Sequence, residues 1–499
     1  MEFRPQTAIQ GVFSVGLINF LARVIAYGKH IVITAYIGLS AQLDAFYMAT
    51  TVMSLAIFVF GDVFDSLGIP RLVKTLQEEG EEEFRKLAGS ILTFGFLLSA
   101  CLNILLLLIA PWTPAIAPGF TPEKKDFLMK NLFYLAPMAI LYLPYHAMGS
   151  FLRAKRRFQA FYFGEILIAV VTLVIVFVWH DSPYIIPLSF SIAYIVVFSY
   201  ILLVSMREIR FTFSVRGEKI RGIIRMLLQI LPAYLTYYLF ALVDRVFASF
   251  LPTGGVSALS YGLMIAVIPG SIFMMENIFI TSLSESGERE AMMKQIVTGV
   301  LIVSIPVALF TAAYANEIVR AAFQRGVFTE ESTRMTGDAL AFFAMAIPAF
   351  FLWPILYRLF QILERVGTIT AIALAAVLTN AGLNYIFLMM GMGIKGLALA
   401  TMLANYVLVL GAVVLYRKFG ISVAGWKSLP VMLFAAGGSV VSLQLIKFLP
   451  ASASTMGGLV LHCMAYLVVT AGLLCLVPNR EIREWRKAVL RQIIPGKRQ

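Results

Sequence analysis

Charged residues inside long apolar stretches are the positions at which this chain could bind a polar cargo. Arg23 and Lys29 lie in the first stretch, six residues or nearly two helical turns apart, so both side chains can reach one cavity. Asn19 precedes them on the same stretch. The bilayer core disfavours charge, so an ionisable residue kept there is a functional candidate. Two cations at this depth could hold a diphosphate or a carboxylate; the alternative is that they extend to the lipid headgroups.

Four further charged residues could serve coupling, gating or cargo contact. Asp244 and Arg245 are neighbours in a later stretch, and neighbours on a helix point about 100° apart, so we expect them to have different partners. Asp244 is a candidate ion or proton site, and Arg245 is a candidate contact for cargo or for a second lobe. Asp44 opens the second stretch, where it either caps the helix or takes part in ion coupling or gating. Glu165 either pairs with a cation or takes part in the same coupling.

Other acidic residues have simpler explanations. Asp62 and Asp65 lie at the cytoplasmic end of the second stretch, and we expect them to pair with Arg71 or to cap a helix. Glu276, in the eighth stretch, could pair with a cation.

The apolar stretches that carry these residues fill most of the chain. Of 499 residues, 60% are hydrophobic and 13% are charged, whereas soluble domains carry roughly 25% charged residues. A span takes about 20 residues, so little chain is left for a soluble catalytic domain. We predict an all-α polytopic membrane protein with about fourteen spans. Their approximate ranges are 11–38, 43–66, 87–111, 128–152, 158–179, 184–205, 224–250, 256–282, 293–315, 336–361, 366–390, 394–416, 428–449 and 455–477.

The basic residues behind the net charge of +13 gather in alternate loops. The positive-inside rule places these loops in the cytoplasm, together with both ends of the chain. Lys124 and Lys125 are exceptions, because they fall on the sparsely charged outer side. The tail, residues 478–499, reads as a basic amphipathic helix lying on anionic lipid.

No catalytic constellation is present in the sequence. The chain lacks GxxxxGK[ST], HExxH and GxSxG motifs, and its three cysteines do not have metal-binding spacing. We therefore expect a transporter, not an enzyme, without a cofactor. Coupling to Na⁺, to H⁺ or to the membrane potential stays open.

Two segments resemble the MviN/MurJ branch of the multidrug/oligosaccharidyl-lipid/polysaccharide (MOP) exporter superfamily. The first begins Phe323-Gln-Arg-Gly-Val-Phe-Thr and resembles the FQRGxFT segment after the ninth helix of that family. The second, residues 22–29 continued by 43–47, resembles its SRxxGxxR and ADAFxxA patterns. By this resemblance Arg23 matches the first cavity arginine. Lys29 stands at the second, where lysine keeps the charge but loses the bidentate fork.

The resemblance implies two six-helix lobes around a cavity, followed by two further helices. The expected parts are an N-terminal lobe at 1–206, a cytoplasmic linker at 207–223, a C-terminal lobe at 224–418, extra spans at 419–477 and the tail at 478–499. Such proteins work by alternating access and turn a lipid-linked saccharide from the cytoplasmic to the outer leaflet.

Two departures from the family pattern bear on the cargo. Ile57-Phe58 replaces an arginine pair expected in span two, and Tyr261-Gly262-Leu263-Met264 replaces a later arginine site. A lipid II flippase relies on those cations to hold the diphosphate. We therefore expect a flippase in the bacterial cytoplasmic membrane for another undecaprenyl-diphosphate-linked saccharide, serving cell-wall or exopolysaccharide synthesis.

Two alternatives stay open: lipid II flipping proper, and MATE-like ion-coupled export of small molecules. The expected partners are the lipid-linked glycan, anionic membrane lipid and glycan polymerase machinery. Nucleic acid is not expected.

Overall fold

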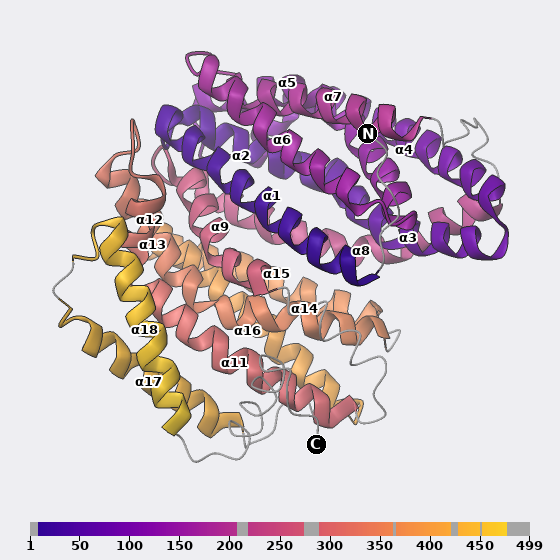
Figure 1. Ribbon diagram of the computed structural model, residues 1–499. Coiled ribbons are helices and arrows are strands. Elements are labelled where there is room, and N and C mark those ends of the chain that lie inside the picture. The colour runs from indigo at the N-terminus through magenta and orange to yellow at the C-terminus, as the bar shows by residue number, and fades with distance from the viewer. Residues whose placement is uncertain are drawn as a thin grey trace. The chain divides into compact units, whose positions relative to one another are not determined.

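The computed structural model describes residues 8–206, 218–273, 289–362, 366–420, 428–449 and 452–476, with the side chains of the first helix from Ala22 onward. Every secondary-structure element in these ranges is a helix (Figure 1). The chain forms two compact units, residues 1–257 with 325–329, and residues 258–324 with 330–499. The lobe boundaries expected from the sequence stay predictions, and the predicted tail and most of the predicted linker lie outside the described residues.

The first unit contains the elements up to α8 and the first residues of α9, whose remaining residues, 258–273, belong to the second unit. They are α1 (Ala8–Ile37), α2 (Ala41–Met53), the π-helix η1 (Ser54–Phe58), α3 (Val59–Glu78), α4 (Glu81–Ile109), the 3₁₀ helix η2 (Ala110–Ile116), α5 (Pro122–Ala154), α6 (Phe158–Val178), α7 (Ile185–Ser205), α8 (Glu218–Ala248) and α9 (Gly255–Phe273).

Local sequence explains where several of these helices begin. Ser40 is the N-cap of α2, and its side chain accepts a hydrogen bond of 3.2 Å from the backbone N–H of Leu43. Thr121 caps α5 in the same way, and Pro122 follows at the first helical position, where its missing N–H costs nothing. Acidic residues 81–83 fill the first turn of α4, where they favour the helix dipole.

One long helical segment, residues 41–78, runs through α2, η1 and α3 without a loop. Its π-helical turn at Ser54–Phe58 widens the backbone between the two α-helical parts. Pro70 lies inside α3. This segment carries Asp44 before the π turn and Asp65 after it, so two candidate sites share one element.

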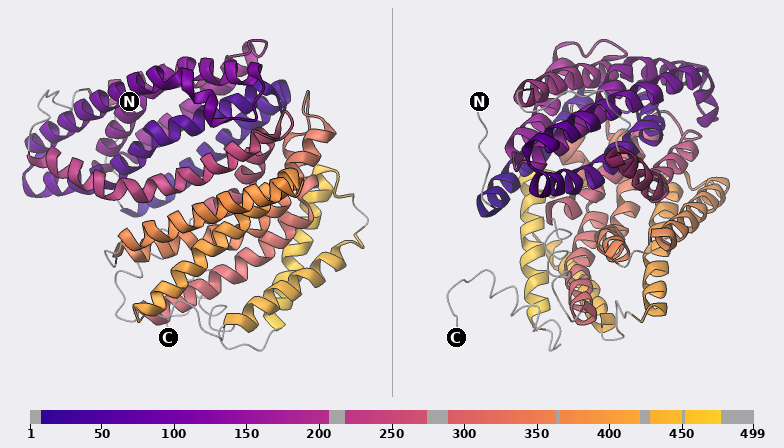
Figure 2. Two further views of the ribbon diagram at one scale, coloured as in Figure 1. Left: turned by 180° about the vertical axis from the view of Figure 1, so that it is seen from behind. Right: turned by 90° about the vertical axis from the view of Figure 1, so that its right-hand side faces the viewer.

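Helix α5 packs against α2, α3, α4 and α7 within the first unit, and α1 packs against α6 (Figures 1 and 2). The core between these helices holds large, fully buried side chains such as Tyr145, Phe84 and Phe151. The rings of Phe84 and Phe151 pack 5.1 Å apart between α4 and α5.

The second unit contains the remaining elements. They are α11 (Arg289–Ala313), α12 (Ala315–Phe323), α13 (Glu330–Met345), α14 (Ile347–Ile362), α15 (Val366–Met389), α16 (Gly393–Lys418), α17 (Ser428–Ile446) and α18 (Met456–Leu476). Helix α16 packs against α13 and α15, and α11 packs against α13 and α17. An apolar cluster joins α11, α17 and α18 through Phe310, Ile446, Leu459 and Tyr466.

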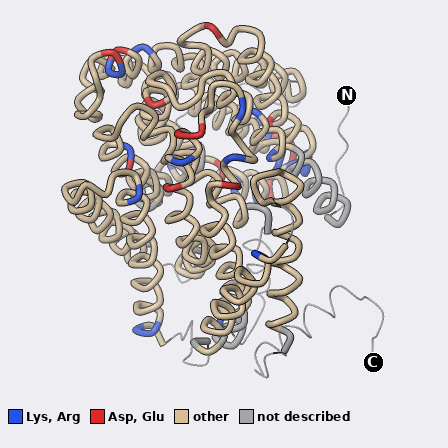
Figure 3. Tube along the Cα trace, turned by 90° about the vertical axis from the view of Figure 1, so that its left-hand side faces the viewer, with Lys and Arg blue, Asp and Glu red and all other residues tan. Residues whose placement is uncertain are grey.

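The described helices suit a membrane protein. Nine of them are long and apolar enough to cross a bilayer, and the number rises to eleven if each of two bent pairs is one span. The predicted count of fourteen and the orientation stay predictions, since parts of the chain lie outside the described ranges. Large apolar side chains such as Leu203 and Val468, both 71% exposed, form outer surfaces that lipid would cover. Charged positions are few along the tube in Figure 3.

Candidate transport site

Lys29 lies buried in the first unit, with 7% of its surface exposed. Its ammonium Nζ is 4.5 Å from the centre of the Phe190 ring on α7, within range of a cation–π interaction. The negative charge that acts on it is the carboxylate of Glu165 on α6. That carboxylate also accepts a hydrogen bond of 2.6 Å from the hydroxyl of Tyr145. Glu165 therefore bonds α6 to α5, and its charge acts on the cation of α1.

Arg23 lies on the same helix and is half-buried. Its charge interacts electrostatically with Tyr162 of α6. The charges of Glu165 and Asp65 act on the same tyrosine. Helix α1, which carries Arg23 and Lys29, packs against α6, and their sharing of one cavity stays a prediction. Asn19 lies on α1, but its side chain is outside the described residues.

Asp65, on α3, binds three groups of α5. One carboxylate oxygen is 3.1 Å from Nδ1 of His146, and the other accepts a hydrogen bond of 3.0 Å from the Ser150 hydroxyl. The second oxygen also pairs with the guanidinium of Arg153. The prediction that Asp65 pairs with Arg71 or caps a helix is therefore wrong. The backbone packing of α3 against α5 brings together residues more than 80 positions apart, which the sequence does not show.

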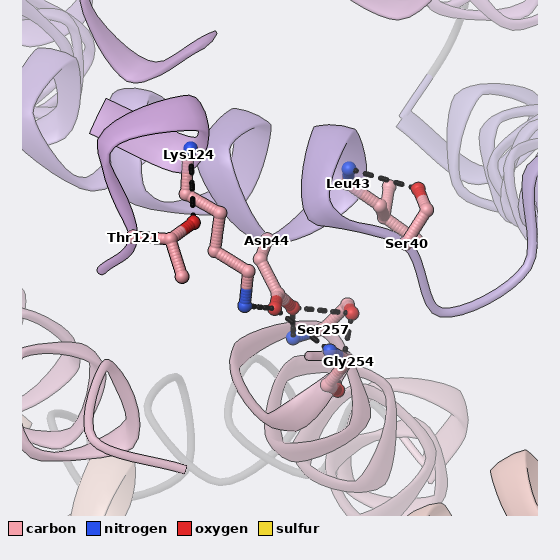
Figure 4. Close-up of polar contacts among 7 residues, drawn as sticks. All are labelled: Ser40, Leu43, Asp44, Thr121, Lys124, Gly254 and Ser257. Carbon is pink, nitrogen blue, oxygen red and sulfur yellow. Dashed lines mark hydrogen bonds and ion pairs between the residues drawn. The ribbon is translucent and has the colours of Figure 1, made fainter. Parts of the chain in front are cut away.

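Asp44 is a fully buried carboxylate that accepts four hydrogen bonds. It is 0% exposed and accepts hydrogen bonds from the backbone N–H of Gly254 (2.8 Å), the backbone N–H of Ser257 (2.9 Å) and the Ser257 hydroxyl (2.7 Å) (Figure 4). Lys124 of α5 donates a fourth bond of 2.8 Å. Because Ser40 caps α2, Asp44 is free to cap the first turn of α9 instead.

Lys124 is a site residue that the sequence reading missed. It is 4% exposed although it falls among the loops that carry little charge. A buried cation needs a partner, and Asp44 supplies it. The sequence did contain a signal for Lys124, because it is a cation among loops that otherwise carry little charge.

Arg245, on α8, binds the backbone and a side chain of α2. Its Nη1 donates to the Tyr47 carbonyl at 2.7 Å and also contacts the Thr51 hydroxyl. The guanidinium carbon lies 5.4 Å from the centre of the Tyr47 ring. Asp244 is buried next to it in the chain. The contacts of Arg245 tie α8 to the last turns of α2, immediately before the π-helix.

Ile57 and Phe58, which stand where the resemblance implies an arginine pair, pack as apolar residues. Ile57 is 0% exposed, and the ring of Phe58 lies 4.3 Å from the ring of Tyr142 on α5. Glu276 and the side chain of Asp62 lie outside the described residues. Within the described part of the chain, no cluster of three His, Cys, Asp or Glu residues could hold a metal ion.

Comparison with known protein sequences identifies relatives along nearly the whole chain. The sequence model of the family described as lipid II flippase MurJ matches residues 33–472. A protein of Aquifex aeolicus (strain VF5), described as a probable lipid II flippase MurJ, is 27% identical over 465 residues, which cover 90% of this chain and 87% of the relative. A Thermotoga maritima protein of the same description is 24% identical over 402 residues, covering 78% and 81%.

Solved structures agree on the fold. A lipid II flippase MurJ in an inward closed conformation matches with a TM-score of 0.77 at 18% identity, covering 97% of this chain and all of the other. An inward-facing MATE multidrug resistance transporter of the MOP superfamily matches with a TM-score of 0.64 at 14% identity, covering 80% and 94%. The resemblance found in the sequence is thereby confirmed. The chain belongs to the MurJ family of lipid flippases, multi-pass transporters of the bacterial cytoplasmic membrane.

Proposed function

We propose that this protein moves lipid II from the cytoplasmic to the outer leaflet for peptidoglycan synthesis. The observation that carries the proposal is the family match over residues 33–472, which begins in the last turn of α1 and includes the described helices from α2 to α17 and most of α18. The relatives from Aquifex and Thermotoga are both described as probable lipid II flippases. This support favours the alternative stated above over a different undecaprenyl-linked glycan.

Arg23 is the residue that we assign to the diphosphate of the cargo. It is half-buried on α1, and a guanidinium can bind two phosphate oxygens at once. Lys29 already lies beside Phe190 and the charge of Glu165. We assign Lys29 to a second phosphate contact, made once its ammonium leaves the Phe190 ring.

We assign to Asp44 the closure of the transport path toward the outer side of the membrane, which we call the outer closure. Its carboxylate holds the first turn of α9 through Gly254 and Ser257, and a passage to the outside requires these bonds to open. Lys124 stays with Asp44 when they do, so the carboxylate keeps a counter-ion in a poorly hydrated place.

Complementation tests the proposed cargo. The gene is expressed in a strain depleted of its own lipid II flippase, and membrane insertion is verified by immunoblot. We expect the wild-type protein and a Lys418→Ala control, changed at an exposed residue at the end of α16, to restore growth, and Arg23→Ala to fail at equal membrane level. Failure of the wild-type protein at normal level would contradict the proposal.

A second cargo is favoured by one observation. Ile57 and Phe58 supply no cation where the family carries an arginine pair, and both pack into the protein. Another undecaprenyl-diphosphate-linked glycan is therefore the second candidate. Rescue of a strain that lacks an exopolysaccharide flippase, without rescue of the lipid II strain, would identify it.

A further inference from the structure

The Asp65 cluster is a group of buried ionisable side chains to which the proposed cargo path gives no role. It consists of Asp65, His146, Ser150 and Arg153, and it lies between α3 and α5. Arg153 is held from the other side by the ring of Phe161, whose centre lies 4.2 Å from the guanidinium carbon. Of the four side chains in the cluster, the imidazole of His146 is the one whose residue type ordinarily titrates near neutral pH.

We propose that His146 and Asp65 form a proton-binding site that is coupled to the transport cycle. The ligand is a single proton, which converts the imidazole of His146 to imidazolium. The coupling rests on the proposed flippase function, whereas the binding of the proton does not.

The charges around His146 favour the binding of this proton. Among the described residues, the charges that act on His146 are those of Asp65 from α3, Arg153 from its own helix α5, and Glu165 from α6. The Asp65 carboxylate pairs with the Arg153 guanidinium, so the cluster is neutral while the imidazole is neutral. Imidazolium would add one positive charge at a ring nitrogen that already lies 3.1 Å from a carboxylate oxygen.

Aromatic rings fix the position of His146. The ring of Tyr142 lies 4.5 Å from the imidazole, and the ring of Tyr145 stands edge-on at 5.6 Å, with its hydroxyl bonded to Glu165. Gly61 of α3 allows this packing, because a side chain there would lie 2.5 Å from Tyr142. The side chains of His146 and Asp65 are still 13% and 23% exposed, so a proton can reach the pair.

The site shares its helical segment with the outer closure. Asp65 follows the π-helix η1 and Asp44 precedes it, in one unbroken helical segment. An imidazolium attracts Asp65 more strongly than a neutral ring does and draws α3 toward α5. A π turn is a frequent place for a functional adjustment in a helix, so the shift can pass to α2 and to the bonds that Asp44 makes.

Nuclear magnetic resonance of ¹⁵N-histidine tests proton binding without any cargo. The full chain has four histidines, so the His146→Gln variant identifies the signal of His146 by its loss. Glutamine keeps a donor for Asp65 but takes up no proton at neutral pH. We expect the His146 signal of the wild-type protein to change from the neutral to the charged form between about pH 5 and 8. A signal that keeps one form across this range would overturn the proposal.

Vesicles that contain the purified protein and fluorescent lipid II test the coupling. We expect a pH gradient to change the rate of lipid II crossing at least severalfold for the wild-type protein and for His180→Gln, an exposed-histidine control. The rates of His146→Gln and Asp65→Asn should not respond. A response of His146→Gln equal to that of the wild-type protein would overturn the coupling. A wild-type protein whose His146 titrates but which moves no lipid II would support the proton site and contradict the proposed cargo instead.

Discussion

At the scale of single residues, the sequence identifies which side chains are unusual but not which side chains they meet. Asp44 stands out as a carboxylate at the start of an apolar stretch, and Lys124 as a cation on a weakly charged side. Their ion pair joins residues 80 positions apart and depends on the packing of α2 against α5. Asp65 shows the same limit, because its neighbour in sequence, Arg71, is not its partner in space.

The burial of the Asp44–Lys124 pair predicts that its single and double variants differ in their free energy of unfolding. We expect Lys124→Met or Asp44→Asn alone to lower the free energy of unfolding by about 3–5 kcal/mol, because each leaves the other charge buried without its partner. The double variant should recover much of this loss. Thermal unfolding in detergent measures all three variants.

Lys125→Met is the matched control for this cycle. Lys125 is the next residue along α5 and is only half-buried, so its loss should change stability by less than about 1 kcal/mol. Equal losses for Lys124→Met and Lys125→Met would show that the buried pair does not stabilise the fold.

At the scale of elements, apolar length predicts helices well and their interruptions poorly. The range predicted as one span at 336–361 forms two helices, α13 and α14, bent by 49°. Pro348 explains the break, because it has no N–H to continue the hydrogen bonds of α13. The π-helix η1 is a second interruption, and its sequence, Ser-Leu-Ala-Ile-Phe, contains neither glycine nor proline to mark it.

Gly326, in the segment that resembles the family motif, has a packing reason. Its φ is +58°, and the backbone N–H of the next residue, Val327, donates to the carbonyl of Ala35 at 2.9 Å. A side chain at residue 326 would collide with that carbonyl oxygen. We expect Gly326→Ala to reduce the folded yield and the melting temperature in detergent.

Gly391→Ala is the control that separates backbone strain from the collision with the Ala35 carbonyl. Gly391 also has a positive φ, +72°, but a side chain there meets no atom within 4 Å. It should cost only the backbone strain, roughly 1–2 kcal/mol. A loss for Gly326→Ala no larger than that for Gly391→Ala would rule out the close contact as the reason for the glycine.

A buried hydrogen bond from Tyr466 ties α18 to α11. The hydroxyl of Tyr466 on α18 donates to the carbonyl of Pro306 on α11 at 2.9 Å. We expect Tyr466→Phe to lower the free energy of unfolding by about 1–2 kcal/mol, because the bond is lost in an apolar cluster. Tyr406→Phe removes a similar bond, to the Met345 carbonyl, at an exposed place and should cost less. The reverse order, measured by thermal unfolding, would contradict the anchoring role.

At the scale of the whole molecule, composition alone predicted an all-helical membrane protein, and the family follows from short segments at residues 22–47 and 323–340. The choice of cargo was harder to predict, because the missing arginines at 57–58 argue against lipid II while the family match argues for it. The loss of a cation removes one contact to the cargo. The effect of that loss on the choice of cargo depends on the charges that remain, such as those of Arg23 and Lys29 on α1.

Transfer of lipid II by the purified protein tests the central claim most directly. Fluorescent lipid II is placed in vesicles with the wild-type protein, Arg23→Ala or Lys418→Ala, and its arrival in the opposite leaflet is measured by quenching from outside. We predict transfer by the wild-type protein and Lys418→Ala, and a loss of at least tenfold for Arg23→Ala with its fold intact. No transfer by a folded wild-type protein under a pH gradient, a Na⁺ gradient and a membrane potential would contradict the assignment of lipid II as its cargo.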